Sequence, residues 1–383
     1  MRIAILTSSR ADYGIYMPLI KKLKEDPFFN LDVIAFGTHL SPFHGETIKQ
    51  IQNDGFDVKY KVESMLLTDS PEAIATAVGL TIIKFADFWN KYKSEFDLVF
   101  CLGDRYEMFA AVTAGIPFNI PFAHLHGGET TLGAIDNIYR HAITLASRYH
   151  FVATDIYAKR VADIIDNKVN ITTVGALSLD NLTSLEMLTI TEFKAKWDID
   201  LSLKTILCTF HPETVSYHSN ETYAEELTQV INRLKAKYQV LITMPNADTA
   251  GNIIRNALNI NFRIDSKVFL IENLGSKSYF TAMKYCSFLL GNTSSGIIEA
   301  ASFGKYVINL GDRQKGRAAG NNVIHTEVNS SAIIDAVNEI EILQNPSNEN
   351  IYWSGGATDK IIKAIKYIDL DTPLVKTFDN LDK

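Results

Sequence analysis

The chain has 383 residues, 46% hydrophobic and 21% charged, which is typical of a globular protein with room for two domains. Its formal net charge of −7 argues against a nucleic-acid partner, because it gives no general basic field. No apolar run is long enough to span a membrane, and the opening "MRIAILTSS" is too short for a signal-peptide core. We therefore expect a cytoplasmic protein without a membrane partner.

In the first half of the chain, short apolar runs alternate with helical patterns. Helices are predicted near residues 16–26, 71–96, 106–115 and 135–147. Between them lie the predicted strands "RIAILTS", "LDVIAFG", "DLVFCLGD", "IPFAHLHGG" and "YHFVAT". Nearly continuous apolar strands separated by helices predict a parallel sheet that is covered on both faces.

The same pattern restarts in the second half, with the strands "KTILCTF", "QVLITMP", "KVFLIEN", "CSFLLGN" and "KYVINLGD". The prediction is an α/β protein of two doubly wound, Rossmann-like domains, covering residues 1–180 and 181–357. Residues 358–383 contain a last helical pattern that we expect to cross back onto the first domain. Ligands of such folds bind beyond the carboxyl ends of the strands, so we expect the site in a cleft between the domains.

The stretch "LLGNTSSGIIEAASFG" reads as a strand, a polar turn and a helix. Ser294 and Ser295 are predicted at the helix start, where free N–H groups and the helix dipole favour an anion. Glu299 follows one turn later, where a carboxylate can bind both hydroxyls of a ribose. The alternative is ordinary helix capping, for which serine is also a preferred residue.

Basic side chains follow two of the predicted strands. Arg10 comes after the first strand of the chain, whereas Arg313, Lys315 and Arg317 lie in "GDRQKGR" after a strand of the second domain. An arginine at a strand end can bind a phosphate in bidentate fashion, although each one alone is equally compatible with a solvated surface. Taken together with the serines, these residues favour a nucleotide diphosphate as ligand.

Acid–base groups gather around two strands of the first domain. Asp104 lies at the end of a buried strand, where an unpaired carboxylate is costly. It is therefore either a functional residue or the partner of Arg105 in a structural ion pair. In "AHLHGGE", His124 and His126 alternate onto one face of a strand, which also permits a metal pair. A metal is the minor interpretation, because neither HExxH nor a cysteine cluster is present.

Further polar groups complete the predicted site. Asp136 and Arg140 are four residues apart and share a helix face, where they form either an internal ion pair or part of the site. His211 directly follows a strand in "CTFHPET", and a histidine there suits general acid–base work. Asn246 follows a strand in the same way, in "MPNADTAG", and is expected to be a substrate ligand.

Eight motifs between residues 8 and 317 occur in the order found in one known family, and the similarity extends over about residues 2–324. They are "SSRADYG", "GDRYE", "HLHGGE", "IDNIYRHAIT", "FHPET", "PNADT", "GNTSSGIIEA" and "GDRQKGR". In this respect the chain resembles the hydrolysing UDP-N-acetylglucosamine 2-epimerases of the bacterial sialic-acid capsule type. The resemblance implies a fold like that of the B-type glycosyltransferases and a UDP-sugar as substrate. It also implies that the enzyme uses neither a metal nor a nicotinamide cofactor and that it forms a dimer or tetramer.

The resemblance also implies a reaction and roles for residues. A base removes the proton at C2 of the sugar while UDP leaves C1, and water then adds to the 2-acetamidoglucal, giving N-acetylmannosamine. Asp104 and Asp136 match acid–base carboxylates of the family, His211 matches its second-domain histidine, and Glu299 matches the ribose ligand. Many members carry a catalytic glutamate at the position of His126, so either His126 or Glu129 is expected to take over its role.

Three alternatives stay open at this point. UDP-N,N'-diacetylbacillosamine differs from UDP-N-acetylglucosamine at C4 and C6, and related hydrolysing epimerases act on each. A glycosyltransferase of the same fold would need an acceptor. A UDP-sugar-binding module without activity is compatible with the missing glutamate.

Overall fold

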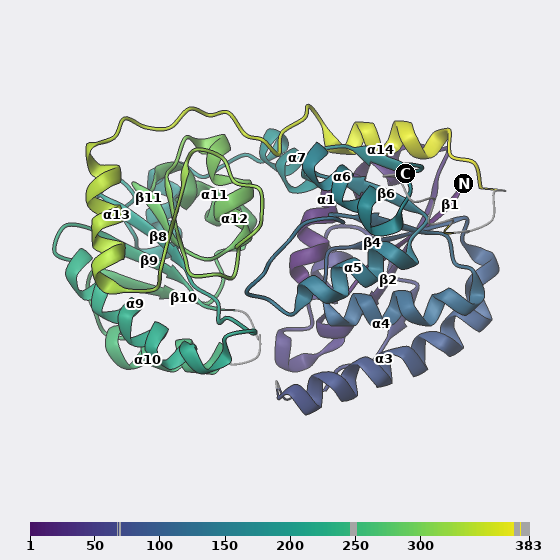
Figure 1. Ribbon diagram of the computed structural model, residues 1–383, viewed down its shortest axis with the longest axis horizontal. Coiled ribbons are helices and arrows are strands. Elements are labelled where there is room, and N and C mark those ends of the chain that lie inside the picture. The colour runs from purple at the N-terminus through teal and green to yellow at the C-terminus, as the bar shows by residue number, and fades with distance from the viewer. Residues whose placement is uncertain (67, 69, 246–250, 371–375, 377–383) are drawn as a thin grey trace. The chain divides into compact units, whose positions relative to one another are not determined.

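The computed structural model describes residues 1–66, 68, 70–245, 251–370 and 376, so the predicted ligand Asn246 lies outside the described residues. The chain forms two compact units (Figure 1). The first unit comprises Met1–Glu129, Asp136–Thr183 and Tyr352–Lys383, and the second comprises Thr130–Ile135 and Ser184–Ile351. The short segment Thr130–Ile135 thus belongs to the second unit, although sequence reasoning places it in the first domain.

The first unit is built on a seven-stranded parallel sheet with the order β3-β2-β1-β4-β5-β6-β7. Its strands are β1 (Arg2–Thr7), β2 (Asn30–Phe36), β3 (Tyr60–Val62), β4 (Leu98–Leu102), β5 (Phe122–Leu125), β6 (Tyr149–Val152) and β7 (Ile171–Thr173). Its helices are α1 (Arg10–Glu25), α2 (Ile48–Asn53), α3 (Pro71–Tyr92), α4 (Tyr106–Gly115), α5 (Asp136–Ala146), α6 (Asp155–Ile165), α7 (Leu177–Ser184) and α14 (Ala357–Lys366). The direction of chain growth across the sheet reverses between β1 and β4.

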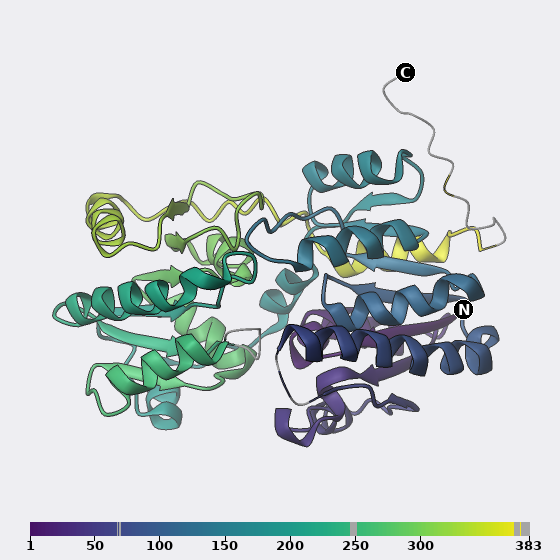
Figure 2. The same ribbon diagram turned by 60° about the horizontal axis from the view of Figure 1, so that its bottom comes forward.

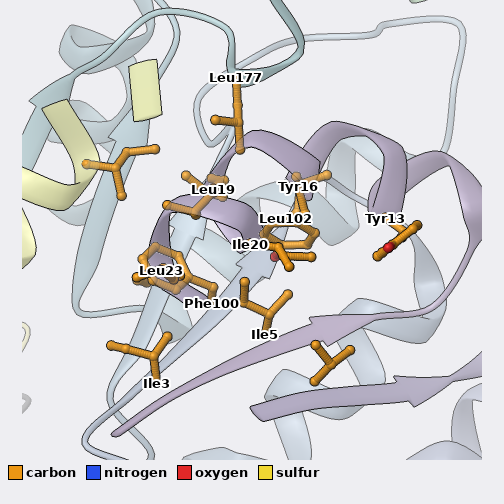
Figure 3. Close-up of a cluster of buried hydrophobic side chains, with 14 of the residues drawn as sticks. Ile3, Ile5, Tyr13, Tyr16, Leu19, Ile20, Leu23, Phe100, Leu102 and Leu177 are labelled. Atoms are coloured by element: carbon orange, nitrogen blue, oxygen red, sulfur yellow. The ribbon is translucent and has the colours of Figure 1, made fainter. Parts of the chain in front are cut away.

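Alternate side chains of β1 enter two different cores, as expected for a strand buried on both faces. Ile3 and Ile5 pack with α1 and α14, and Figure 3 shows this cluster around Tyr16, Leu19 and Leu23. Ala4 and Leu6 face the opposite side, where α3, α4 and α5 contribute the side chains Phe85, Trp89, Met108 and Ile143. The indole N–H of the fully buried Trp89 donates to the carbonyl oxygen of Ala111 at 3.0 Å, which ties α3 to α4.

The C-terminal helix α14 belongs to the first unit, where Figure 2 shows it in yellow beside the N-terminal elements. The Asp180 carboxylate accepts from the N–H groups of Ala357 and Thr358 at 3.1 and 2.6 Å, a favourable place for a negative charge at a helix start. Ile361 and Ile365 are buried in the same core as α1, and Lys22 of α1 forms an ion pair with Asp359.

The second unit repeats the architecture with a six-stranded parallel sheet of the order β10-β9-β8-β11-β12-β13. Its strands are β8 (Thr205–Thr209), β9 (Gln239–Thr243), β10 (Val268–Ile271), β11 (Phe288–Gly291), β12 (Val307–Leu310) and β13 (Val323–Thr326). Its helices are α8 (Ile190–Trp197), α9 (Asn220–Leu234), α10 (Gly251–Phe262), α11 (Gly275–Tyr285), α12 (Ser294–Ile298) and α13 (Ser330–Ile342). Helices α9, α10 and α13 share one apolar core with this sheet.

Both units therefore have the strand order of a doubly wound fold, and the predicted α/β class with two such domains is confirmed. Among the described residues, no helix has both the length and the apolar character needed to cross a membrane.

Candidate active site

Four of the predicted site residues follow the strand pairs at which the order of a doubly wound sheet reverses, which is where ligands of such folds bind. In the first unit these strands are β1 and β4, and Arg10 and Asp104 follow them. In the second unit they are β8 and β11, which His211 and Ser294 follow. Because parallel strands all end at one edge of their sheet, each pair of residues lies at the same edge of its unit.

The turn that presents Arg10 is held by a buried carboxylate. Asp12 accepts hydrogen bonds from the Thr7 hydroxyl at 2.7 Å, from the N–H and hydroxyl of Ser8 at 2.8 and 2.9 Å, and from the N–H of Ser9 at 3.0 Å. Ser9 in turn caps α1 through the N–H of Asp12, in a capping box. Arg10, the exposed first residue of α1, therefore starts from a backbone whose conformation is fixed.

Asp104 is paired with Arg140 of α5, by an ion pair that the sequence did not reveal. One Asp104 carboxylate oxygen accepts from Nη2 of Arg140, and Nη1 of Arg140 donates to the carbonyl oxygen of Glu129 at 3.0 Å. The Arg140 side chain is only 2% exposed, so its charge depends on these partners. Arg105, the alternative partner of Asp104, forms a two-pronged ion pair with the buried Glu107 at 2.8 and 3.1 Å.

His126 and Glu129 form a second polar pair in the first unit. Nδ1 of His126 lies 2.8 Å from a carboxylate oxygen of Glu129, and both side chains are almost fully buried. A carboxylate at Nδ1 favours the tautomer with the proton on that nitrogen, which leaves Nε2 as an acceptor. Among the described residues, Nε2 of His126 is buried and has no hydrogen-bond partner.

The predicted alternation of His124 and His126 is wrong, because only His124 lies in β5. His126 follows the strand with a φ of 63°, a left-handed conformation that takes its side chain out of the strand pattern. His124 is held by the carbonyl oxygen of Gly103 at 2.9 Å and by the Thr144 hydroxyl at 3.1 Å. Burial lowers its pKa to about 4, so it is neutral near pH 7.

His124 and His126 therefore have different environments. Both ring nitrogens of His124 have protein partners, so this residue is a core histidine and not half of a metal pair. Over the described parts of the chain, no three His, Cys, Asp or Glu side chains lie close enough to hold a metal ion.

Helix α5 carries the remaining candidates of the first unit. It begins at Asp136, which is partly exposed one turn before the buried Arg140. His141 follows and is half-buried, and its pKa is lowered by burial and, to a lesser extent, by the positive charges of Arg140 and Arg160. Asp136 and Arg140 lie on one helix, as predicted, and Arg140 forms an ion pair with Asp104.

In the second unit, Asn292 fixes the backbone of His211. The His211 N–H donates to the Asn292 side-chain oxygen at 2.7 Å, and the Asn292 side-chain amide donates to the His211 carbonyl oxygen at 2.8 Å. The carbonyl oxygen of Asn292 accepts from Nε2 of Gln314 at 2.9 Å and from Nη1 of Arg313 at 3.4 Å. One buried asparagine thus joins three of the predicted motifs.

Glu213 holds the loop Gly311–Arg317, which carries the predicted basic residues. One of its carboxylate oxygens accepts from the Asp312 N–H at 2.6 Å. A side chain at Gly311, where φ is 69°, would lie 2.5 Å from this oxygen, so the close approach requires glycine. Burial raises the pKa of Glu213, and hydrogen bonds from the loop backbone oppose that rise. Arg317 lies in the same loop, and its N–H donates to the Gln314 carbonyl oxygen at 3.1 Å.

Ser294 and Ser295 begin α12 as predicted, but the helix is only five residues long and its N-cap is Thr293. The Thr293 hydroxyl accepts from the Ser295 N–H at 3.4 Å. So short a helix contributes little dipole to the binding of an anion. Glu299 follows the helix, is 6% exposed, and donates its N–H to the Ser295 carbonyl oxygen at 2.9 Å.

Sequence reasoning missed the residues that support the predicted ones. Asn292, Glu213 and Gln314 all lie inside the quoted motifs, but only the structure shows that they are buried. Glu107 was missed in the same way, although it lies in the motif "GDRYE" together with Asp104. A buried polar side chain next to a predicted ligand has to be hydrogen-bonded, which makes it a candidate for positioning that ligand.

Comparisons with known proteins agree with the resemblance of the motifs. A family model described as UDP-N-acetylglucosamine 2-epimerase matches residues 21–366. The chain is 34% identical over 371 residues to the polysialic acid biosynthesis protein P7 of Escherichia coli, covering 95% of this chain and 93% of that protein. It is 33% identical over 384 residues to the GDP/UDP-N,N'-diacetylbacillosamine 2-epimerase (hydrolyzing) of Campylobacter jejuni, covering 99% of each.

The fold has close counterparts among solved structures. The UDP-GlcNAc 2-epimerase from Neisseria meningitidis bound to UDP-GlcNAc matches with a TM-score of 0.80 at 19% identity, covering 96% of this chain and 100% of that one. A likeness at this identity concerns the fold, whereas the family model and the two sequence relatives concern ancestry. Together they confirm that the chain belongs to the UDP-N-acetylglucosamine 2-epimerase family, the nucleotide-sugar 2-epimerases.

Proposed function

We propose that the protein is a hydrolysing epimerase that converts UDP-N-acetylglucosamine into UDP and free N-acetylmannosamine, in sialic-acid biosynthesis. The C2–H bond breaks, its electron pair forms the C1=C2 double bond, and UDP leaves with the electrons of the C1–O bond. Water then adds its hydroxyl to C1 and a proton to C2 on the face opposite to that of the lost proton. The polysialic acid relative supports this assignment.

The observation that carries the proposal is the buried pair of His126 and Glu129. The C2 proton is weakly acidic, so its removal needs a positioned base. Glu129 orients the imidazole through Nδ1 at 2.8 Å, and the buried Nε2 lacks a partner among the described residues. We therefore assign proton transfer to Nε2 of His126 and the orienting role to Glu129, by analogy with other carboxylate–imidazole pairs.

Two other acid–base groups of the first unit complete the assignment. Asp104 and Asp136 are proposed to serve the second proton transfer, with His211 of the second unit as a third group. Arg140, which was predicted as a possible part of the site, is engaged by Asp104 and by the Glu129 carbonyl oxygen. Its proposed role is to fix the carboxylate of Asp104 and the backbone that carries Glu129.

The departing diphosphate is assigned to the basic and hydroxyl groups found at the strand ends. They are Arg10 of the first unit and Ser294, Ser295, Arg313 and Arg317 of the second, with Glu299 as the ribose ligand. Asn246, outside the described residues, keeps its predicted role as a substrate ligand. Preorganised donors stabilise the negative charge that develops on the leaving group.

A second substrate is favoured by a specific observation. The Campylobacter relative, which matches 99% of this chain, is described as acting on GDP- or UDP-linked N,N'-diacetylbacillosamine. The same acid–base groups serve either sugar, because both reactions take place at C1 and C2. UDP-N,N'-diacetylbacillosamine is therefore the second candidate, and each nucleotide sugar should be offered to the enzyme separately, without an acceptor.

In heavy water, we expect the released N-acetylmannosamine to carry one deuterium at C2, because the proton taken from C2 is replaced from solvent. Mass spectrometry and proton NMR of the sugar give this result directly. Undeuterated N-acetylglucosamine as product would indicate simple hydrolysis and overturn the elimination mechanism. If the enzyme turns over only UDP-N,N'-diacetylbacillosamine, the proposed mechanism would stand but the proposed substrate would be wrong.

Removing a phosphate ligand should weaken UDP binding. We expect Arg10→Ala and Ser294→Ala each to raise the Kd for UDP roughly tenfold to hundredfold, since a hydrogen bond to a charged group contributes about 1.5–3 kcal/mol. Isothermal titration calorimetry measures this affinity. Arg233→Ala on α9 and Ser331→Ala in the first turn of α13, both exposed, are the matched controls. Equal UDP affinities for the wild type, the two variants and the two controls would show that Arg10 and Ser294 do not bind the phosphates.

A further inference from the structure

The segment Thr130–Ile135 belongs to the second unit, although the residues before and after it belong to the first. It forms backbone hydrogen bonds with the loop Gly311–Arg317, from the Leu132 N–H to the Lys315 carbonyl oxygen and from the Gly133 N–H to the Asp312 carbonyl oxygen, both at 3.0 Å. The Ile135 N–H donates to the Thr214 hydroxyl at 3.1 Å. These hydrogen bonds fasten the segment in its middle and at its C-terminal end.

Gly133 permits the closest of these contacts. A Cβ atom at this position would lie 2.6 Å from the backbone nitrogen of Arg313 and 2.6 Å from both carbonyl atoms of Asp312. All three neighbours are backbone atoms, which cannot move aside as the end of a flexible side chain can. Even alanine would therefore push the segment and the loop apart.

The partners of the segment are themselves part of the proposed phosphate site. Gly133 meets the backbone of Asp312 and Arg313, and the Asp312 N–H is held by the carboxylate of Glu213. Thr214, which accepts from Ile135, directly follows Glu213 in the chain. A shift of the loop that carries Arg313 would therefore also displace Thr130–Ile135.

The residues that flank the segment belong to the proposed proton-transfer site. Glu129, the partner of His126, immediately precedes it, and Asp136, the first residue of α5, immediately follows it. A chain of six residues spans at most about 20 Å when extended, so anchoring its middle constrains both ends. Arg140 adds a direct link between the flanks, because it donates to the Glu129 carbonyl oxygen at 3.0 Å.

We infer that Thr130–Ile135 is a positioning segment, in which Gly133 and Thr214 transmit the position of the loop Gly311–Arg317 to His126, Glu129 and Asp136. This inference rests on the proposed function, since it assigns the phosphate ligands and the proton-transfer groups to the two ends of the connection. Binding of the UDP group by the loop then sets the acid–base residues in their working geometry. Neither Gly133 nor Thr214 needs to touch the substrate.

Steady-state kinetics test the inference through the balance of kcat and KM. Thr214→Val removes the acceptor of the Ile135 N–H while keeping the side-chain shape, and we expect it to lower kcat about fivefold to tenfold, the effect of one hydrogen bond. Thr214→Ser keeps the hydroxyl and should retain most of the kcat. Gly133→Ala should lower kcat about hundredfold, as small displacements of catalytic groups do. Gly79→Ala is the control, because a Cβ at Gly79 has nothing within 4 Å.

Hydrogen exchange gives a readout that does not depend on turnover. In the wild type and in Thr214→Ser, UDP should slow amide exchange in α5, and in Thr214→Val this protection should be reduced while the Kd for UDP stays within about twofold. Wild-type kcat and wild-type protection of α5 in Thr214→Val would overturn the inference. So would a loss of kcat that is matched by an equal loss of UDP affinity, since the segment would then only support the phosphate site. A wild type that neither binds UDP nor releases a sugar would instead refute the proposed function.

Discussion

Replacing His126 with asparagine should lower kcat by about 10²–10⁴-fold, the usual contribution of a general acid or base. Nε2 of His126 is buried and has no hydrogen-bond partner among the described residues, while Nδ1 is engaged by Glu129 at 2.8 Å. Asparagine cannot take up a proton, so elimination would lose its base. Stopped-flow or coupled UDP-release assays measure kcat, and UDP affinity and the melting temperature should stay near those of the wild type.

Glu129→Gln is the informative companion of this variant. Glutamine can still accept a hydrogen bond from Nδ1 but carries no charge to stabilise a protonated imidazole, so we expect a smaller loss of kcat than in His126→Asn. His218→Asn, at an exposed histidine, is the matched control and should leave kcat unchanged. If Glu129→Gln is inactive and His126→Asn stays active, the base is the carboxylate and the assignment made here is reversed.

Asp104→Asn should lower both activity and stability. The Arg140 guanidinium is 2% exposed, and the variant takes away the charge that compensates it. A buried group left poorly satisfied costs about 1–3 kcal/mol, so the free energy of unfolding should fall by an amount in this range. We also expect kcat to fall at least hundredfold, because the carboxylate is a proposed proton-transfer group. Urea denaturation and kinetics on the same preparation measure both quantities.

Glu107→Gln separates the two effects of Asp104→Asn. Glu107 is also a buried carboxylate paired with an arginine, but its partner is Arg105 and no reaction step is assigned to it. We expect this variant to lose stability while kcat changes by no more than a few-fold. Equal losses of kcat in the two variants at matched stability would show that Asp104 acts only through the fold.

The longer elements of the fold were predictable because their sequences are periodic. Every predicted strand of four or more apolar residues appears in one of the two sheets, since a strand buried on both faces must be apolar at nearly every position. The strands that were missed, β3, β7 and β13, have three or four residues and lie at the edges of their sheets. An edge strand has one neighbour and is partly exposed, so its sequence need not be continuously apolar.

The position of the site was likewise predictable, but its pairings were not. Arg10, Asp104, His211 and Ser294 were found because strand ends at the point of reversed order present side chains to ligands. The partner of Asp104 is 36 residues away in Arg140, whereas its neighbour Arg105 pairs with Glu107. From the sequence alone, the nearest residue of opposite charge is the obvious candidate for an ion pair. In the folded protein, the pairing depends instead on which side chains are buried together and point toward each other.

By itself, the sequence determined the α/β class, the two domains, the family and the residue types of the proposed chemistry, because all of these follow from local periodicity and from motifs of neighbouring residues. Only the tertiary structure decided that His126 leaves its strand at a φ of 63°, that Arg140 compensates Asp104, and that Thr130–Ile135 belongs to the second unit. Each of these depends on contacts between segments far apart in the chain. Such contacts are selected by close packing and by the need to pair buried charges and N–H groups, which no short stretch of sequence records.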